Sequence, residues 1–89
     1  MKTCILDGNV ILNKEMLHEM LAEQLDFPHW YGKNLDALYD LLTDLQETEI
    51  VIFHQEALFD HLERYASLLI RVLEDAAKEN HGIRWRVAE

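Results

Sequence analysis

The side chains best suited to binding chemistry in this 89-residue chain are aspartates that recur at a helical interval. Asp36, Asp40 and Asp44 are four residues apart, so on an α-helix they stack along one face at about 6 Å per step. Residues 34–49 hold five acidic side chains and no basic one, and like charges at this spacing destabilise a helix. The row is either an ordinary solvated face of an acidic protein or a surface for a basic partner.

Aromatic side chains surround these aspartates and favour the second interpretation. Trp30, Tyr31 and Tyr39 are rigid, and rigid aromatics beside charges are typical of the centre of a protein interface. Of these three aromatics, Tyr31 is the first candidate for the core. Tyr39 lies on the helix that carries the aspartates but off its leucine stripe, so it should be partly exposed. Carboxylates spaced like nucleic-acid phosphates, framed by aromatics where bases would stack, indicate a nucleic-acid mimic that binds a basic nuclease pocket.

Hydrophobic periodicity predicts three strands and about four helices around this segment. The branched run of residues 50–53 is typical of a strand buried on both faces, and the alternation in residues 83–87 indicates a strand with one polar face. Strands separated by helices usually lie parallel with right-handed crossovers, so we expect one α/β domain over residues 1–89 with a small three-stranded parallel sheet. The first half is predicted to form strand 3–6, a helix capped by Asn13 and running to Leu25, and a helix beginning near Asn34. The second half is predicted to form strand 50–53 and a helix around residues 58–62. After a break at residues 65–67, a longer helix capped by Ser67 runs to a stop at His81 and Gly82, and strand 83–87 follows.

Charge composition limits the classes of partner. Seventeen acidic residues against eight basic ones give a net charge of -9, which disfavours direct nucleic-acid binding because that needs a basic surface. The acidity is concentrated early, with ten acids and three bases in residues 1–49 but seven acids and five bases in residues 50–89. A basic protein partner fits this imbalance, and long-range attraction would speed its association.

Cysteine usage and the N-terminus indicate the compartment. Cys4 is the one cysteine and lies in a predicted buried strand, so we expect an inert small side chain and a reducing cytoplasm. The first residues lack the apolar core of a signal peptide, and no stretch approaches the roughly 18 apolar residues of a membrane span. We therefore expect a chain that starts at its own N-terminus and remains soluble in the cytoplasm.

The five histidines raise two competing hypotheses, a metal site and an acid–base enzyme. No pair has the spacing of a metalloprotease helix, so we expect surface or boundary histidines and neither a metal nor a cofactor. A small acid–base enzyme could use His29 with Asp36 or Asp40, but the chain has no Gly-rich phosphate loop to support phosphoryl transfer. The basic residues near the C-terminus are expected to neutralise neighbouring glutamates on a solvated strand.

The segment Phe-Pro-His-Trp-Tyr-Gly-Lys-Asn-Leu-Asp-Ala-Leu-Tyr-Asp at residues 27–40 resembles the signature of the barstar family, the intracellular inhibitors of barnase-type ribonucleases. Its Tyr-Gly-x-Asn-Leu-Asp-Ala-Leu core is contiguous and therefore specific. The resemblance implies a three-stranded parallel sheet packed with helices. It also implies that the second helix and the preceding loop plug the active site of a basic, extracellular-type ribonuclease in a 1:1 complex, without a cofactor.

The resemblance also assigns roles to individual residues. Asp40 would occupy the phosphate position, Asp36 would pair with a second basic group, and Trp30 would pack on the catalytic histidine. Tyr39 falls where the family has a Trp, and Asp75 where it has a peripheral acid. The complete set of expected partner-binding residues is Trp30, Tyr31, Gly32, Asn34, Asp36, Tyr39, Asp40, Asp44 and Asp75. An immunity protein against a different toxin nuclease is the alternative within the same class.

Overall fold

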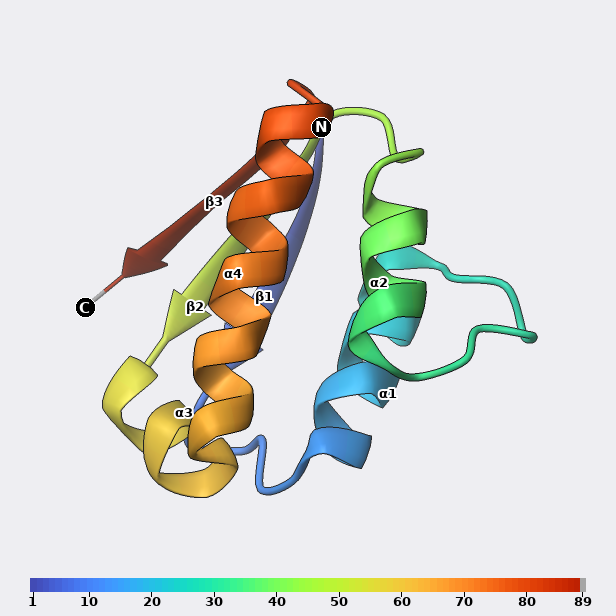
Figure 1. Ribbon diagram of the computed structural model, residues 1–89. Helices are drawn as coiled ribbons and strands as arrows, with labels where there is room; N and C mark the ends of the chain where they lie inside the picture. The colour runs from blue at the N-terminus through green and yellow to red at the C-terminus, as the bar shows by residue number, and fades with distance from the viewer. Residues whose placement is uncertain (89) are drawn as a thin grey trace.

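The computed structural model describes residues 1–88 and confirms the predicted α/β class (Figure 1). The elements follow the predicted order: β1 (Lys2–Asp7), α1 (Lys14–Leu25), α2 (Leu35–Leu42), β2 (Thr48–Phe53), α3 (Gln55–Leu62), α4 (Arg64–Glu79) and β3 (Ile83–Ala88). The three strands are parallel in the order β1-β2-β3, so β2 is the central strand, as its branched run predicted. No helix among the described residues is long and apolar enough to cross a membrane.

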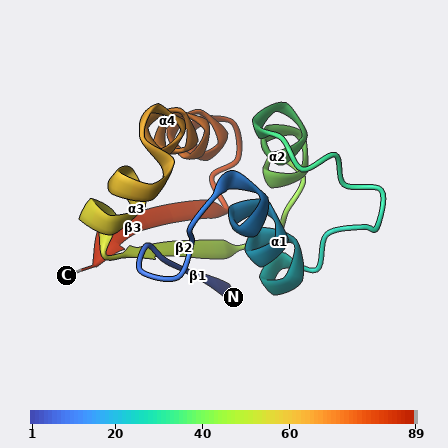
Figure 2. The same cartoon turned by 90° about the horizontal axis from the view of Figure 1, so that it is seen from below.

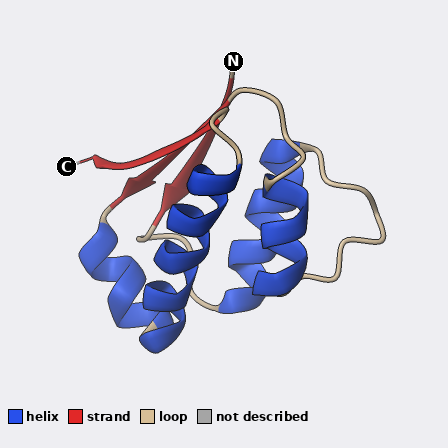
Figure 3. Ribbon diagram, turned by 45° about the horizontal axis from the view of Figure 1, so that its top comes forward, coloured by secondary structure: helices blue, strands red, loops and turns tan. Residues whose placement is uncertain are grey.

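The sheet presents one face to the helices, which lie together on one side of it (Figure 3). Cys4 pairs with Ile50, and both side chains are fully buried on the helix-facing side. On the opposite face, Arg86 Nε lies 3.3 Å from Glu49 Oε2, so the prediction of a polar face on β3 is confirmed. Burial raises the pKa of the Cys4 thiol to about 12, which keeps it protonated and unreactive.

Three predicted boundaries were wrong because local backbone geometry overrides the apolar pattern. The break between α3 and α4 lies at Glu63, whose left-handed φ of 52° turns the chain, so Ser67 lies inside α4 and caps nothing. Helix α4 ends at Glu79, the next residue Asn80 is extended, and Gly82 does not have the positive φ of a glycine stop. Helix α2 ends at Leu42, so Asp44 lies outside it.

Residues at the carboxyl ends of β1 and β2 pack closely. The Gly8 N–H donates to the carbonyl of Phe53 at 2.8 Å, and the next residue, His54, adopts a left-handed φ of 53°. The His54 ring lies 2.8 Å from a carboxylate oxygen of Asp7, and the Asn9 N–H donates to the same oxygen at 2.9 Å. These hydrogen bonds leave little space between the β1 turn and the start of α3.

A buried histidine connects α1, the loop before α2, and α4. His18 is 1% exposed, with Nδ1 2.6 Å from the Tyr31 hydroxyl and Nε2 2.7 Å from the Tyr65 hydroxyl. The expectation of surface or boundary histidines is therefore wrong for His18, because two tyrosines satisfy both of its ring nitrogens. A neutral imidazole has one donor and one acceptor, so one hydroxyl donates to the ring and the other accepts from it.

Stability should fall in mildly acidic solution because of His18. Burial lowers the pKa of His18, with nearby Glu15 raising it and Lys14 and Lys33 lowering it to smaller extents. Below the unfolded pKa of about 6.5, the unfolded chain therefore binds a proton more readily than the folded chain. We expect the urea midpoint to hold above about pH 7 and to decline as the pH falls toward 5.

The matched variants for this pH series are His18→Gln and His81→Gln. The first should flatten the decline, because glutamine can bond both tyrosines without titrating. The second removes an exposed imidazole and should leave the decline intact. A parent midpoint that does not change between pH 7 and pH 5 would contradict the buried neutral imidazole.

Candidate functional site

The loop between α1 and α2 projects from the body of the molecule in two perpendicular views (Figures 1 and 2) and is anchored by one aromatic side chain. Tyr31 is 6% exposed, its hydroxyl bonds His18, and its ring centroid lies 4.8 Å from that of Phe27. Trp30, the preceding residue, is 68% exposed. The prediction that Tyr31 belongs to the core is confirmed, so this residue holds the loop while the Trp30 side chain is exposed to solvent.

Asn34 starts helix α2, as predicted. Its Oδ1 accepts from the Ala37 N–H at 2.8 Å, and its Nδ2 donates to the Gly32 carbonyl at 3.3 Å. Lys33 just before it has a left-handed φ of 54°, which is uncommon for a residue with a Cβ. The Asn34 amide therefore acts within the chain and positions the helix, while Gly32 is exposed beside it.

Helix α2 presents its acidic side chains outward because its apolar side chains are buried. Leu38 and Leu42 are fully buried, whereas Asp36 and Asp40 are exposed one turn apart. Asp44 is also exposed, but it lies in the tight turn after the helix, where its N–H donates to the Leu41 carbonyl at 3.2 Å. The predicted row of three helical aspartates is therefore a pair plus one carboxylate in a turn.

Asn80 fixes the other end of α2, and sequence reasoning missed it. The Asn80 Nδ2 donates to the carbonyls of Leu42, Thr43 and Leu45 at 3.0, 3.3 and 2.8 Å, and its Oδ1 accepts from the Gly82 N–H at 2.9 Å. These carbonyls belong to the last turn of α2 and the loop after it. An asparagine at a helix end carries no sequence signal for a partner 35 to 38 residues away.

Helix α4 brings further acids to α2, and the two helices lie side by side in Figures 1 and 2. Burial raises the pKa of Tyr39, and the charges of Glu79, Asp75 and Asp40 raise it further, so carboxylates from both helices act on one phenol. Asp75 was expected at the site, but Glu79 was missed, although it follows Asp75 by one helical turn. We call Asp36, Asp40, Asp75, Glu79 and Tyr39 the acidic face.

The carboxylates of the acidic face lack counter-charges. Within residues 1–88, the two ion pairs are His54 with Asp7 and Arg86 with Glu49, and neither includes a member of this face. Exposed like charges without counter-ions destabilise the free protein slightly and attract a cationic partner strongly. The arrangement is suited to binding a basic surface.

Comparison with known proteins agrees with this geometry. The sequence profile of the family described as Barstar (barnase inhibitor) matches residues 1–88. The chain is also 37% identical over 81 residues, covering 89% of each protein, to a Bacillus subtilis (strain 168) protein named "Putative ribonuclease inhibitor YrdF". The chain belongs to the barstar family. The resemblance seen in residues 27–40 is thereby confirmed, and barstar similarity extends over nearly the whole chain.

The family is described as one of barnase inhibitors, which bind an enzyme and are not enzymes themselves. Within residues 1–88, no hydrogen bond or ion pair joins His29 to Asp36 or Asp40, and no group of three His, Cys, Asp or Glu side chains is placed to hold a metal ion. The Cys4 thiol is buried in the sheet.

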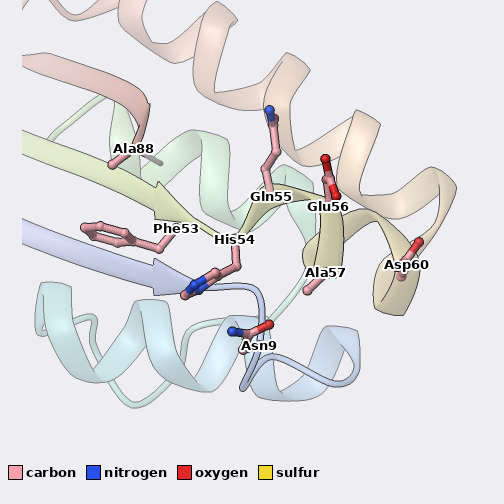
Figure 4. A pocket seen from close by; sticks show the side chains of 8 residues that line it. All are labelled: Asn9, Phe53, His54, Gln55, Glu56, Ala57, Asp60 and Ala88. Carbon is pink, nitrogen blue, oxygen red and sulfur yellow. The ribbon is translucent and has the colours of Figure 1, made fainter.

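A shallow hollow of about 490 Å³ lies elsewhere, at the carboxyl ends of the strands (Figure 4). Its lining includes Asn9, His54, Glu56 and Asp60, and none of the predicted partner-binding residues takes part. This hollow is therefore separate from the acidic face.

Proposed function

We propose that this protein inhibits a barnase-type, guanyl-specific ribonuclease by inserting the acidic face into the basic active-site cleft. The observation that carries the proposal is that α2 and α4 pack against each other and expose Asp36, Asp40, Asp75 and Glu79, none of which has an ion-pair partner within residues 1–88. Family membership and the name of the Bacillus subtilis relative support a ribonuclease as the target class. We infer that the protein acts in the cytoplasm and protects the cell that makes the enzyme.

The expected roles follow from the chemistry of each side chain. Asp40 would take the place of a substrate phosphate and accept charge-assisted hydrogen bonds from cationic groups of the enzyme. Asp36 would pair with a second cation, and Asp75 and Asp44 would contribute at the periphery. Trp30 and Tyr39 would supply desolvated contact area, as aromatic anchors do in protein interfaces.

Titration of the protein into a barnase-type guanyl-specific ribonuclease tests the proposal. RNA cleavage should fall linearly with added protein and reach its minimum at one equivalent. If this enzyme remains fully active at a large molar excess of the protein, the barnase-type target is wrong. In that case, the same titration against other basic toxin nucleases tests the alternative target.

Association should be strongly dependent on salt. The net charge of -9 and the acidic face attract a basic enzyme at long range. Salt screens this attraction beyond the Debye length, which is roughly 8 Å at physiological ionic strength. We expect the association rate constant to fall about tenfold or more between 20 mM and 500 mM NaCl, with a much smaller change in the dissociation rate. Stopped-flow fluorescence measures both, and an association rate independent of salt would exclude electrostatic steering.

A further inference from the structure

A small cationic hollow lies beside the acidic face, at the start of α2. Lys14 from the start of α1 and Lys33 from the loop before α2 are 19 positions apart in sequence but line the same hollow of about 280 Å³. Its other lining residues are Asn34, Leu35, Asp36 and Tyr65. Because Asp36 also belongs to the acidic face, the hollow is continuous with the proposed contact surface.

The convergence of these lysines is notable in so acidic a segment. Residues 1–49 contain three basic side chains, and two of them meet here, while the third, Lys2, lies on β1. The Lys14 Nζ is 5.8 Å from the Tyr65 ring centroid, a distance at which the ring face attracts a cation.

Neither lysine is neutralised inside the molecule. Both residues are exposed, and the two ion pairs within residues 1–88 leave out Lys14, Lys33 and Asp36. Lys33 also keeps a left-handed backbone that glycine or asparagine would adopt at less cost. The proposed contact surface therefore carries exposed carboxylates on α2 and α4, and two ammonium groups beside Asp36 at the start of α2.

We propose that the hollow between Lys14 and Lys33 receives a carboxylate of the partner ribonuclease and so selects among basic nucleases. The inference rests on the proposed function and adds a requirement to it. A suitable enzyme must carry an Asp or Glu at the rim of its cationic cleft, facing the start of α2. A nuclease with a uniformly basic rim would meet two ammonium groups there, and like charges across an interface oppose binding.

Charge reversal at Lys33 tests this requirement in the ribonuclease titration described above. Lys33→Glu should raise the inhibition constant about tenfold or more, because a carboxylate would then face a carboxylate. Lys2→Glu is the matched control, since it changes the net charge equally on an exposed residue of β1, and it should alter the constant less than about twofold. Lys33→Asn removes the charge but accepts the left-handed backbone, and it should give an intermediate loss.

A rescue experiment identifies the opposing group. Single Asp and Glu residues at the rim of the ribonuclease cleft are replaced by Lys, and each enzyme variant is titrated with Lys33→Glu. We expect one enzyme variant to restore inhibition to within about threefold of the parent pair. The proposal is overturned if Lys33→Glu inhibits as well as the parent while Asp40→Ala does not, or if no enzyme variant restores inhibition. A parent protein that inhibits no ribonuclease would instead refute the proposed function itself.

Discussion

Replacing Asp40 with alanine should weaken the complex with the ribonuclease by about 2–5 kcal/mol, which is roughly thirtyfold to several thousandfold in the inhibition constant. Asp40 follows Asp36 by one turn on α2, and its charge acts on Tyr39 together with the charges of Asp75 and Glu79 on α4. Its removal would leave the cations of the enzyme buried without a counter-charge, and most of the loss comes from that penalty. The barnase–barstar complex is the standard example of this effect.

The control for Asp40→Ala is Asp60→Ala. Asp60 is an exposed acid on α3, so its removal changes the net charge equally but leaves the acidic face intact. We expect Asp60→Ala to bind within about twofold of the parent. Equal inhibition constants for the two variants would show that the loss at Asp40 is a general charge effect and that the acidic face is not the contact.

Adding one methyl group at Gly8, as Gly8→Ala, should destabilise the fold strongly. We expect the free energy of unfolding to fall by about 3 kcal/mol or more. A Cβ at Gly8 would collide with the His54 carbonyl oxygen and lie 2.6 Å from the backbone nitrogen of Leu58. Both atoms are main-chain atoms at the start of α3, so neither can rotate away. The measurement is the urea midpoint, and a loss below about 1 kcal/mol would contradict the close approach.

Gly32→Ala is the matched control for this stability measurement. A Cβ at Gly32 would meet the Nδ2 of Asn34 at 3.2 Å and the Cβ of Ala37 at 3.5 Å. The first is the end of a side chain and can shift by a few tenths of an ångström. We expect a loss below about 1 kcal/mol, so the two glycines should differ clearly although they receive the same methyl group.

Local signals predicted much of the fold and the helix that carries the central residues of the candidate site. Asn13 was predicted as an N-cap and Asn34 as the start of the second helix, and each side chain accepts a hydrogen bond at 2.8 Å from the backbone N–H three residues ahead. The parallel arrangement followed from strands separated by helices. Asp36 and Asp40 were found because a helix without neutralising bases is unusual, and their exposure on α2 confirms their placement.

The parts that sequence reasoning missed depend on contacts between distant segments. The stop of α2 at Leu42, which leaves Asp44 outside the helix, coincides with the hydrogen bonds from Asn80. His18 is polar and was expected at the surface, but Tyr31 and Tyr65 satisfy it in the core. The hollow lined by two distant lysines likewise exists only after folding has brought the start of α1 and the loop before α2 together.

The position of the contact surface is tested most directly by amide hydrogen exchange of the protein, alone and in its complex with the ribonuclease. Slower exchange on binding should be confined to residues 30–44 and to the C-terminal turns of α4 around Asp75 and Glu79. The amides of β3 and α3 should exchange at unchanged rates. Protection centred on the open face of the sheet or on the hollow at the strand ends, with α2 unaffected, would contradict the acidic face as the inhibitory surface.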